Sequence, residues 1–297
     1  MNTFLTIYKN KIEIQQKGYS GTPIIILTGM GCSFDEWHEI TETLSKTNRV
    51  FMFHRPGLGE SEIGNEVRNT EAVVNEMQEM MRLLEIDEQI LLVGHSYGGL
   101  CAQHFVQLHP ENVKGIVLVD STSVDLRILD ELDLPVLNED SDEKWMEKCL
   151  LYSNMNQEEL RKMINPSLSE KQKLFPLQIQ HRLMDFQTNP NLYKAMYSEI
   201  SNWKNDAEII KNIGDFPDKP LIIIGRDKEF NIQLGVQDGL PEWEIRLLEE
   251  KWQELILEQE KLTNVSELVF AKRSSHSVHM DRPDVIIDAI KRIQSRL

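Results

Sequence analysis

The residues best suited to chemistry lie in the stretch ILLVGHSYGG, where Ser96 stands between Gly94 and Gly98. Four apolar residues precede these glycines, and a helical pattern follows them. A Gly-x-Ser-x-Gly sequence between a strand and a helix forms a tight turn that lifts the serine hydroxyl above the sheet. The glycines avoid collisions with the neighbouring strand and helix, and the helix dipole favours negative charge at the turn. The sequence therefore predicts Ser96 as a nucleophile, with the side chains of His95 and Tyr97 packed beside the turn.

A serine hydroxyl is a weak nucleophile at neutral pH and requires a base that accepts its proton. The segment SSHSVHMDRPDVI offers His276 and His279 between the last predicted strand and the last predicted helix. We favour His276 because it stands closest to the strand, between small serines, whereas His279 leads into the helix. The other histidines are more typical of surface or helix positions, and these are His38, His54, His104, His109 and His181.

Short apolar runs alternate with helical patterns along the chain, as in a parallel sheet that is buried on both faces. Apolar spacing predicts helices over residues 70–84, 98–109 and 283–294. The first strands, near residues 3–8 and 11–16, should form an antiparallel hairpin at the sheet edge. The pattern predicts an α/β fold with a doubly wound, mostly parallel sheet. Its core strands should cover residues 24–27, 50–53, 90–93, 115–119, 221–224 and 266–270.

Residues 124–213 interrupt this alternation, because their pattern is helical and they contain no convincing core strand. The segment is too long for a plain crossover between two strands. We therefore predict a helical cap over the carboxyl ends of the strands, inserted into a core domain of residues 1–123 and 214–297. A further helical pattern over residues 243–262 is interpreted as one buried face, with a dimer seam as the alternative.

The 297-residue chain carries a net charge of −16, which disfavours nucleic acid and anionic membranes as partners. No stretch is long and apolar enough for a membrane span, and the first residues lack the apolar core of a signal peptide, so we expect a cytoplasmic protein. The three cysteines, Cys32, Cys101 and Cys149, have no metal-ligand spacing. We predict no metal, no cofactor, and a monomer or homodimer that acts on a small molecule.

Four motifs in this order resemble those of the α/β-hydrolase superfamily, over nearly all of the chain except the predicted cap. ILTGMGCSFDEW is similar to the family's His-Gly-x-Gly loop, and HRPGLGES to its Asp-x-x-Gly-x-Gly-x-Ser turn. LLVGHSYGG resembles its nucleophile elbow, and SSHSVHMDRPDVI its histidine loop. Two positions depart from the family pattern, since Thr28 replaces the first histidine of the loop and His54 stands where the family often has aspartate.

The resemblance implies a catalytic triad and an oxyanion hole. One donor of the hole should be the backbone N–H of Tyr97, the residue after the nucleophile, and the other a loop N–H, for which we expect Met30. Gly29 and Gly31 let the loop backbone approach the substrate closely. Because both donors belong to the backbone, the departure at Thr28 leaves the predicted hole intact.

The acid of the triad has two main candidates. Asp120 ends the predicted strand of GIVLVDSTS, with no insertion between strand and acid. Asp227 follows the strand of PLIIIGRDKEF, but it comes one residue earlier than the family's Gly-x-x-Asp, and Lys228 fills the usual position. This spacing favours Asp120 over Asp227, and Asp125 and Glu229 remain as further candidates.

These residues predict a carboxylesterase-like serine hydrolase (EC 3.1.1) that cleaves a small, largely apolar ester or related acyl substrate through an acyl-enzyme on Ser96. Dehalogenases and epoxide hydrolases of the superfamily resemble such enzymes but have an aspartate as nucleophile. One alternative is a non-catalytic ligand-binding or receptor protein on the same fold. Others are a perhydrolase, an acyltransferase, or an aminopeptidase that uses the same site.

Overall fold

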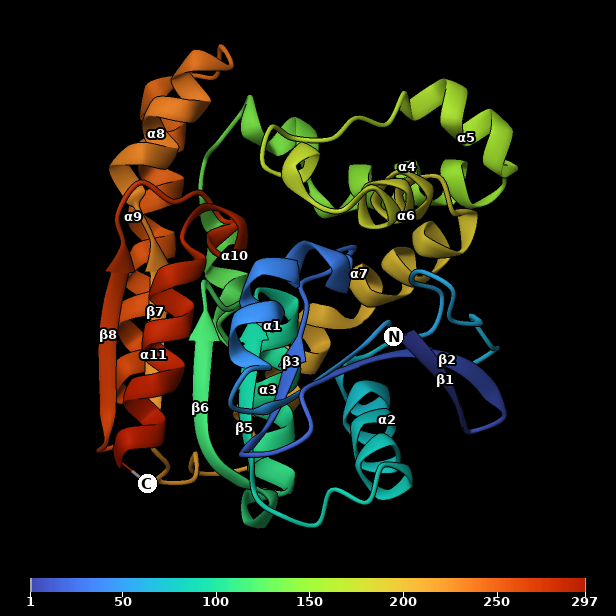
Figure 1. Ribbon diagram of the computed structural model, residues 1–297. Coiled ribbons are helices and arrows are strands. Elements are labelled where there is room, and N and C mark those ends of the chain that lie inside the picture. Colours follow the sequence, from blue (N-terminus) through green and yellow to red (C-terminus); the bar gives the residue numbers. More distant parts are fainter. Residues whose placement is uncertain (1, 297) are drawn as a thin grey trace.

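The computed structural model describes residues 2–296 and contains one eight-stranded sheet (Figure 1). The strands are β1 (Asn2–Ile7), β2 (Asn10–Lys17), β3 (Pro23–Leu27), β4 (Arg49–Phe53), β5 (Ile90–His95), β6 (Val113–Val119), β7 (Leu221–Arg226) and β8 (Ser266–Ala271). Their order across the sheet is β1-β2-β4-β3-β5-β6-β7-β8. The predicted doubly wound, mostly parallel sheet is confirmed, and each predicted core strand corresponds to an observed one.

The edge of the sheet is the antiparallel hairpin that the sequence predicts. β1 pairs with β2, and β2 continues antiparallel against β4. Tyr8 and Lys9 form the tight connection with positive φ angles of 46° and 75°, the sense of turn that matches the twist of paired strands. All other neighbouring strands run parallel, so their carboxyl ends meet at one edge of the sheet.

Helices cover both faces of the sheet: α1 (His38–Leu44) and α11 (Pro283–Arg296) one face, and α2 (Thr70–Leu83), α3 (Tyr97–Leu108) and α9 (Glu242–Gln259) the other (Figure 1). Successive strand residues alternate between the two apolar layers because side chains of a strand point to opposite faces. In β5, Ile90 and Leu92 pack with α2 and α3, whereas Leu91 and Val93 pack with α1 and α11. Burial on both faces explains why these strands are continuous apolar runs in the sequence.

Between β6 and β7 the described chain consists of helices and loops only. Ala195 lies against Gly57 and Met196 against Gly31, in the loops that follow β4 and β3. These contacts and Figure 1 place the segment at the edge where the parallel strands end. We call residues 124–213 the cap. Its helices are η3 (Leu126–Glu131), η4 (Leu137–Asp140), α4 (Asp142–Ser153), α5 (Gln157–Ile164), η5 (Gln172–Leu174), α6 (Leu177–Gln187) and α7 (Pro190–Lys211).

Short helices of the core were not predicted, because few of their residues form a periodic apolar face. They are α1, α8 (Lys228–Gln237), α10 (Val278–Asp281), η1 (Phe34–Trp37) and η2 (Pro110–Asn112). The predicted helix over residues 243–262 is α9 followed by η6 (Glu260–Leu262). Ile245 and Leu255 of α9 are buried within the chain, as the buried-face interpretation requires. No helix within residues 2–296 has the length and apolar composition needed to cross a membrane.

Candidate active site

Ser96 occupies a strained turn between β5 and α3. Its φ of 53° and ψ of −124° lie in a region that residues with side chains rarely adopt. A Cβ at Gly94 would lie 2.6 Å from the carbonyl oxygen of Gly98, and a Cβ at Gly98 would lie 2.3 Å from that of Leu27. Only glycine fits at both positions. The turn therefore holds the serine at the carboxyl edge of the sheet, as the sequence predicts.

The loop after β3 passes directly beside this turn. A Cβ at Gly29 would lie 3.2 Å from the Ser96 Cβ, so a larger residue would crowd the serine. Gly31 has a φ of 65°, which favours glycine, and Met196 of the cap covers it. Within residues 2–296, the backbone N–H groups of Met30 and Tyr97 donate no hydrogen bond to the chain. Two unused donors therefore remain beside Ser96.

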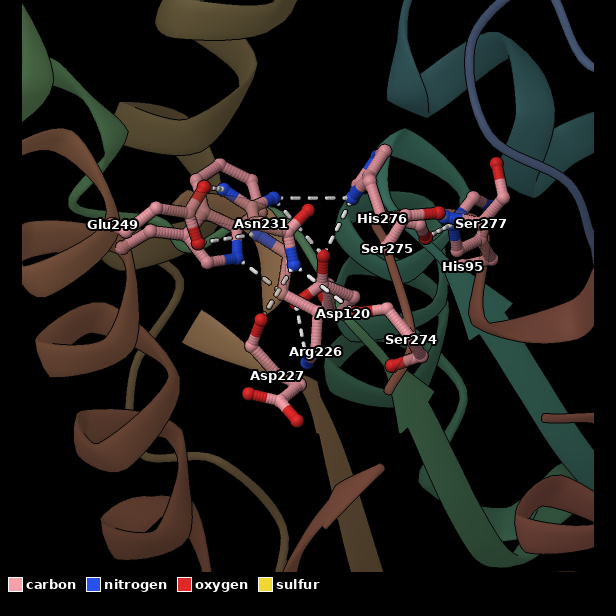
Figure 2. A network of polar contacts seen from close by, with 12 residues as sticks. His95, Asp120, Arg226, Asp227, Asn231, Glu249, Ser274, Ser275, His276 and Ser277 are labelled. Carbon is pink, nitrogen blue, oxygen red and sulfur yellow. Dashed lines mark hydrogen bonds and ion pairs between the residues drawn. The ribbon is translucent and has the colours of Figure 1, made fainter. Parts of the chain in front are cut away.

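His276 lies in the loop between β8 and α10, and its Nδ1–H donates to Asp120 Oδ2 over 2.6 Å (Figure 2). The loop is tied to the elbow, because His95 Nε2–H donates to the backbone carbonyl of His276 over 2.9 Å. The His276 side chain is 41% exposed, which leaves it accessible to a substrate. Among the described residues Ser96 Oγ has no hydrogen-bond partner, so the serine and the imidazole are not bonded to each other in this structure.

Asp120 directly follows β6 in a fully buried position, with a φ of 40°. Besides His276, its carboxylate accepts from Trp252 Nε1–H over 2.9 Å and from Arg226, through the backbone N–H over 3.2 Å and Nη1–H over 3.1 Å. Burial alone raises the pKa of Asp120, but the Arg226 guanidinium and the hydrogen bonds from His276 and Trp252 outweigh it and hold the pKa well below its ordinary value. The carboxylate beside His276 is therefore ionised at neutral pH.

The other candidate acids lie elsewhere. Asp227 caps α8 by accepting from the N–H of Phe230 over 3.2 Å, and it also accepts from the N–H of Arg273 over 2.8 Å. Figure 2 shows its carboxylate turned away from His276. Asp125 pairs with Lys211, and Glu229 with Arg246. Of the four carboxylates, only Asp120 is brought to the imidazole.

Comparisons with known proteins identify the family of the chain. A family model described as the alpha/beta hydrolase fold matches residues 22–205. The chain belongs to the α/β-hydrolase family. It is 22% identical over 278 residues to the uncharacterized protein YqjL of Bacillus subtilis (strain 168). The matched region covers 93% of this chain and 84% of that protein.

Solved structures of this family superpose on nearly the whole chain. The epoxide hydrolase CorEH without ligand has a TM-score of 0.68 at 16% identity and covers 100% of this chain and 99% of that one. A thermophilic esterase from Thermogutta terrifontis with bound malate has a TM-score of 0.67 at 18% identity and covers 100% of this chain and 98% of that one. At such identities the likeness shows the fold alone, so the site must be interpreted from its own residues.

The second candidate base of this α/β hydrolase, His279 of α10, is packed into the core. His279 is 2% exposed and stacks on Trp37, with ring centroids 4.8 Å apart and planes 3° apart. Its Nε2 lies 3.5 Å from Glu36 Oε2, on the side of η1. The structure therefore places His279 away from Asp120, in a packing position.

His54, which departs from the family pattern, is buried in a polar cluster of this hydrolase. Its Nδ1–H donates to Glu13 Oε2 over 2.7 Å, and its Nε2 accepts from the N–H of Phe34 over 3.1 Å and lies 3.2 Å from Ser33 Oγ. Burial raises the pKa of Glu13, but His54 and Arg182 of the cap lower it to about 2. Ser33 is 1% exposed, so this serine–histidine–carboxylate arrangement is closed to substrate and joins the β2, β3 and β4 segments.

Three residues around Asp120 were not predicted as part of the site. Trp252 and Glu249 come from α9, and Arg226 from the end of β7. Arg226 bridges Asp120 and Glu249, with its Nη2 2.6 Å from Glu249 Oε1, and its guanidinium lies 4.4 Å from the Trp252 ring centroid. The charge of Arg226 therefore compensates the charge of Asp120. Spacing could not identify this contact, because α9 and β6 are distant in sequence.

Proposed function

We propose that this α/β hydrolase is a serine esterase that cleaves a small, largely apolar carboxylic ester. Ser96 is the nucleophile, His276 the base, Asp120 the acid, and the N–H groups of Met30 and Tyr97 the oxyanion hole. The observation that carries the proposal is the 2.6 Å bond between His276 Nδ1 and buried Asp120. His276 lies in a loop whose backbone carbonyl accepts a hydrogen bond from His95, the residue before Ser96 in the strained turn.

The acylation step follows from these positions. Ser96 Oγ attacks the carbonyl carbon of the ester while its proton passes to His276 Nε2. The negative charge that develops on the carbonyl oxygen is stabilised by the N–H groups of Met30 and Tyr97, which have no other acceptor within residues 2–296. The tetrahedral intermediate then expels the alkoxide, which takes the proton from Nε2 and leaves as an alcohol.

Deacylation repeats these roles with water as the nucleophile. His276 accepts a proton from water as the water attacks the acyl-enzyme. The tetrahedral intermediate then expels Ser96 Oγ, which takes this proton back from Nε2, and the acid product is released. Asp120 remains ionised throughout and stabilises the imidazolium that forms in each half of the reaction. Its bonds to Trp252 and Arg226 hold the carboxylate in one orientation.

Residue types around the site favour an ester over other substrates of the fold. Epoxide hydrolases of the superfamily would have an aspartate at position 96, where this chain has serine. An aminopeptidase would need a cap carboxylate for the substrate ammonium. The buried cap acids are engaged, however, Glu199 with Arg55 and Asp206 with the N–H of Thr70. Met30 and Met196 add apolar surface beside the loop.

A panel of p-nitrophenyl esters from acetate to decanoate tests this proposal. Wild-type protein should hydrolyse at least one ester with saturation kinetics, and Ser96→Ala should lose that activity while its circular dichroism spectrum stays unchanged. An inactive wild-type protein, or a Ser96→Ala variant with wild-type turnover, would refute the proposal.

A further inference from the structure

Arg55, in the turn after β4, is 2% exposed and donates to the backbone of the predicted oxyanion loop. Its Nη1–H donates to the carbonyl of Thr28 over 2.9 Å, and its Nη2–H to the carbonyl of Gly29 over 3.1 Å. The Gly29 carbonyl belongs to the peptide that carries the Met30 N–H, and the Thr28 carbonyl belongs to the peptide before it. A charged donor on two consecutive carbonyls restrains the orientation of both peptide groups.

The orientation of the second peptide decides where the Met30 N–H points. The carbonyl of Gly29 and the N–H of Met30 belong to one planar trans peptide, so they point in opposite directions. Arg55 holds this carbonyl on its own side, and the N–H of Cys32 donates to the same oxygen over 3.3 Å, so the N–H of Met30 is turned to the other side. A rotated peptide would present a carbonyl oxygen where the oxyanion hole requires a donor.

The other side of the guanidinium is bound by the cap. Arg55 Nε–H donates to Glu199 Oε1 over 2.7 Å, and Nη2–H to Glu199 Oε2 over 3.1 Å. Glu199 lies on α7 and is fully buried. The same helix carries Met196, which covers Gly31 of the loop. One guanidinium thus joins the cap helix to the backbone that should donate to the oxyanion.

We propose that Arg55 is a positioning residue for the oxyanion hole, and that Glu199 sets its position, so that the seating of α7 determines the orientation of the Met30 N–H. This inference rests on the proposed esterase function. It assigns the Arg55–Glu199 pair a role beyond stability: the pair acts on the transition state through the Gly29–Met30 peptide and does not touch the substrate.

The chain offers a matched control in a second buried ion pair. Arg68 donates to Glu76 through Nη1–H over 2.6 Å and Nη2–H over 2.7 Å, and their side chains are 2% and 7% exposed. Within residues 2–296, the guanidinium of Arg68 makes no hydrogen bond with the loop around Gly29. Breaking either pair leaves a buried charge without its full set of partners. Both changes should therefore lower stability, but only one should alter the hole.

The experiment compares Arg55→Lys, Glu199→Gln, the double variant that carries both of these changes, and Arg68→Lys with wild-type protein. It measures kcat and KM on the best p-nitrophenyl ester, and the melting temperature. It also measures the inhibition constants of a trifluoromethyl ketone, which forms an oxyanion on the serine, and of the matching secondary alcohol, which does not. The lysine side chain is shorter and ends in a single ammonium group. This group can pair with Glu199 but cannot reproduce the forked contact with the carbonyls of Thr28 and Gly29.

Arg55→Lys should lower kcat and weaken trifluoromethyl ketone binding in parallel, each by about 10²-fold, the effect of a small displacement of a donor. KM and alcohol binding should stay close to wild type. Glu199→Gln should act in the same direction, and the double variant should lose less than the product of the single losses because both act through one contact. Arg68→Lys should lower the melting temperature while retaining kcat.

Two results would overturn the inference. One is wild-type kcat and ketone affinity in both Arg55→Lys and Glu199→Gln. The other is a loss of kcat in Arg68→Lys that equals the loss in Arg55→Lys, when the two variants have similar melting temperatures. If Arg55→Lys does not fold, Glu199→Gln decides by the same criteria. An inactive wild-type protein would instead contradict the esterase function, so the two failures are distinguishable.

Discussion

The imidazole of His276 and the carboxylate of Asp120 meet at 2.6 Å, although 156 positions separate them in the sequence. The parallel sheet brings them together, because Asp120 follows β6 and His276 follows β8, two strands further along the same edge. Because the carboxylate accepts from Nδ1–H, Nε2 is the ring nitrogen that accepts the Ser96 proton in the proposed mechanism.

Asp120→Asn should lower kcat by about 10⁴-fold, because an amide no longer stabilises the imidazolium or selects the correct tautomer. Asp227→Asn is the matched control, since its remaining carbonyl oxygen can still cap α8, and its kcat should stay near wild type. Both values should be measured on one ester after circular dichroism shows that the variants are folded. A near-normal Asp120→Asn with a collapsed Asp227→Asn would reverse the assignment of the acid.

His276→Ala should lose nearly all turnover, because the base is removed. His279→Ala should keep most of its kcat but lose about 1–3 kcal/mol of unfolding free energy, because the imidazole that stacks on Trp37 is buried. Ester hydrolysis and urea unfolding of both variants test this. Loss of turnover in a well-folded His279→Ala, together with an active His276→Ala, would exchange their roles.

Trp252→Phe removes the hydrogen bond from the indole N–H to Asp120 Oδ1 but keeps an aromatic ring under Arg226. A hydrogen bond to a charged group contributes about 1.5–3 kcal/mol, so unfolding free energy should fall by this order. The fall in kcat should be smaller than in Asp120→Asn, because Arg226 and His276 still hold the carboxylate. Unfolding and kinetic measurements on the same preparation check both statements, and unchanged stability would show that the bond contributes nothing.

Asp206 predicts a pH dependence of stability. Burial raises its pKa from 3.8 to about 6, although the N–H of Thr70 donates to it over 2.9 Å. Between pH 4 and 6 the folded protein holds a proton that the unfolded chain has released, so the contribution of this group to stability falls as pH rises through that window. Above it, ionised Asp206 destabilises the fold by about 3 kcal/mol.

Asp206→Asn keeps an acceptor for Thr70 without the buried charge. The variant should be more stable than wild type at pH 7.5 by up to about 3 kcal/mol, and this advantage should shrink towards pH 4. Urea unfolding of both proteins at several pH values measures the difference in their free energies of unfolding. The contributions of the other titrating groups are the same in both proteins and cancel in this difference. A difference that is constant with pH would contradict the raised pKa.

Much of the fold could be predicted because its signals are local. Strands buried on both faces must be continuous apolar runs, and the Ser96 turn needs Gly94 and Gly98 at fixed spacing, since both positions lie against neighbouring backbone. The position of His276 between the last strand and the last helix is also a local feature. The helix α8 was missed because its ten residues, which follow the capping Asp227, show little helical periodicity of apolar side chains.

The contacts that connect these parts could not be predicted, because they join distant segments through side-chain orientation. The sequence spacing left both Asp120 and Asp227 as candidates for the triad acid. The structure separates them, because the Asp120 carboxylate faces the imidazole and the Asp227 carboxylate caps a helix. Trp252 and Arg226 reach Asp120 from two other elements. Arg55 and Glu199 meet across 144 positions. None of these pairs leaves a pattern in a single sequence.

Labelling with a fluorophosphonate, followed by mass spectrometry of the digested protein, tests the central claim most directly. An activated serine displaces fluoride and keeps the phosphonyl group, and a serine without a base does not react at a comparable rate. Wild-type protein should carry one adduct, on the peptide that contains Ser96, and Ser96→Ala should carry none. A folded wild-type protein that stays unmodified, or an adduct that persists undiminished in Ser96→Ala, would contradict a serine hydrolase with Ser96 as its nucleophile.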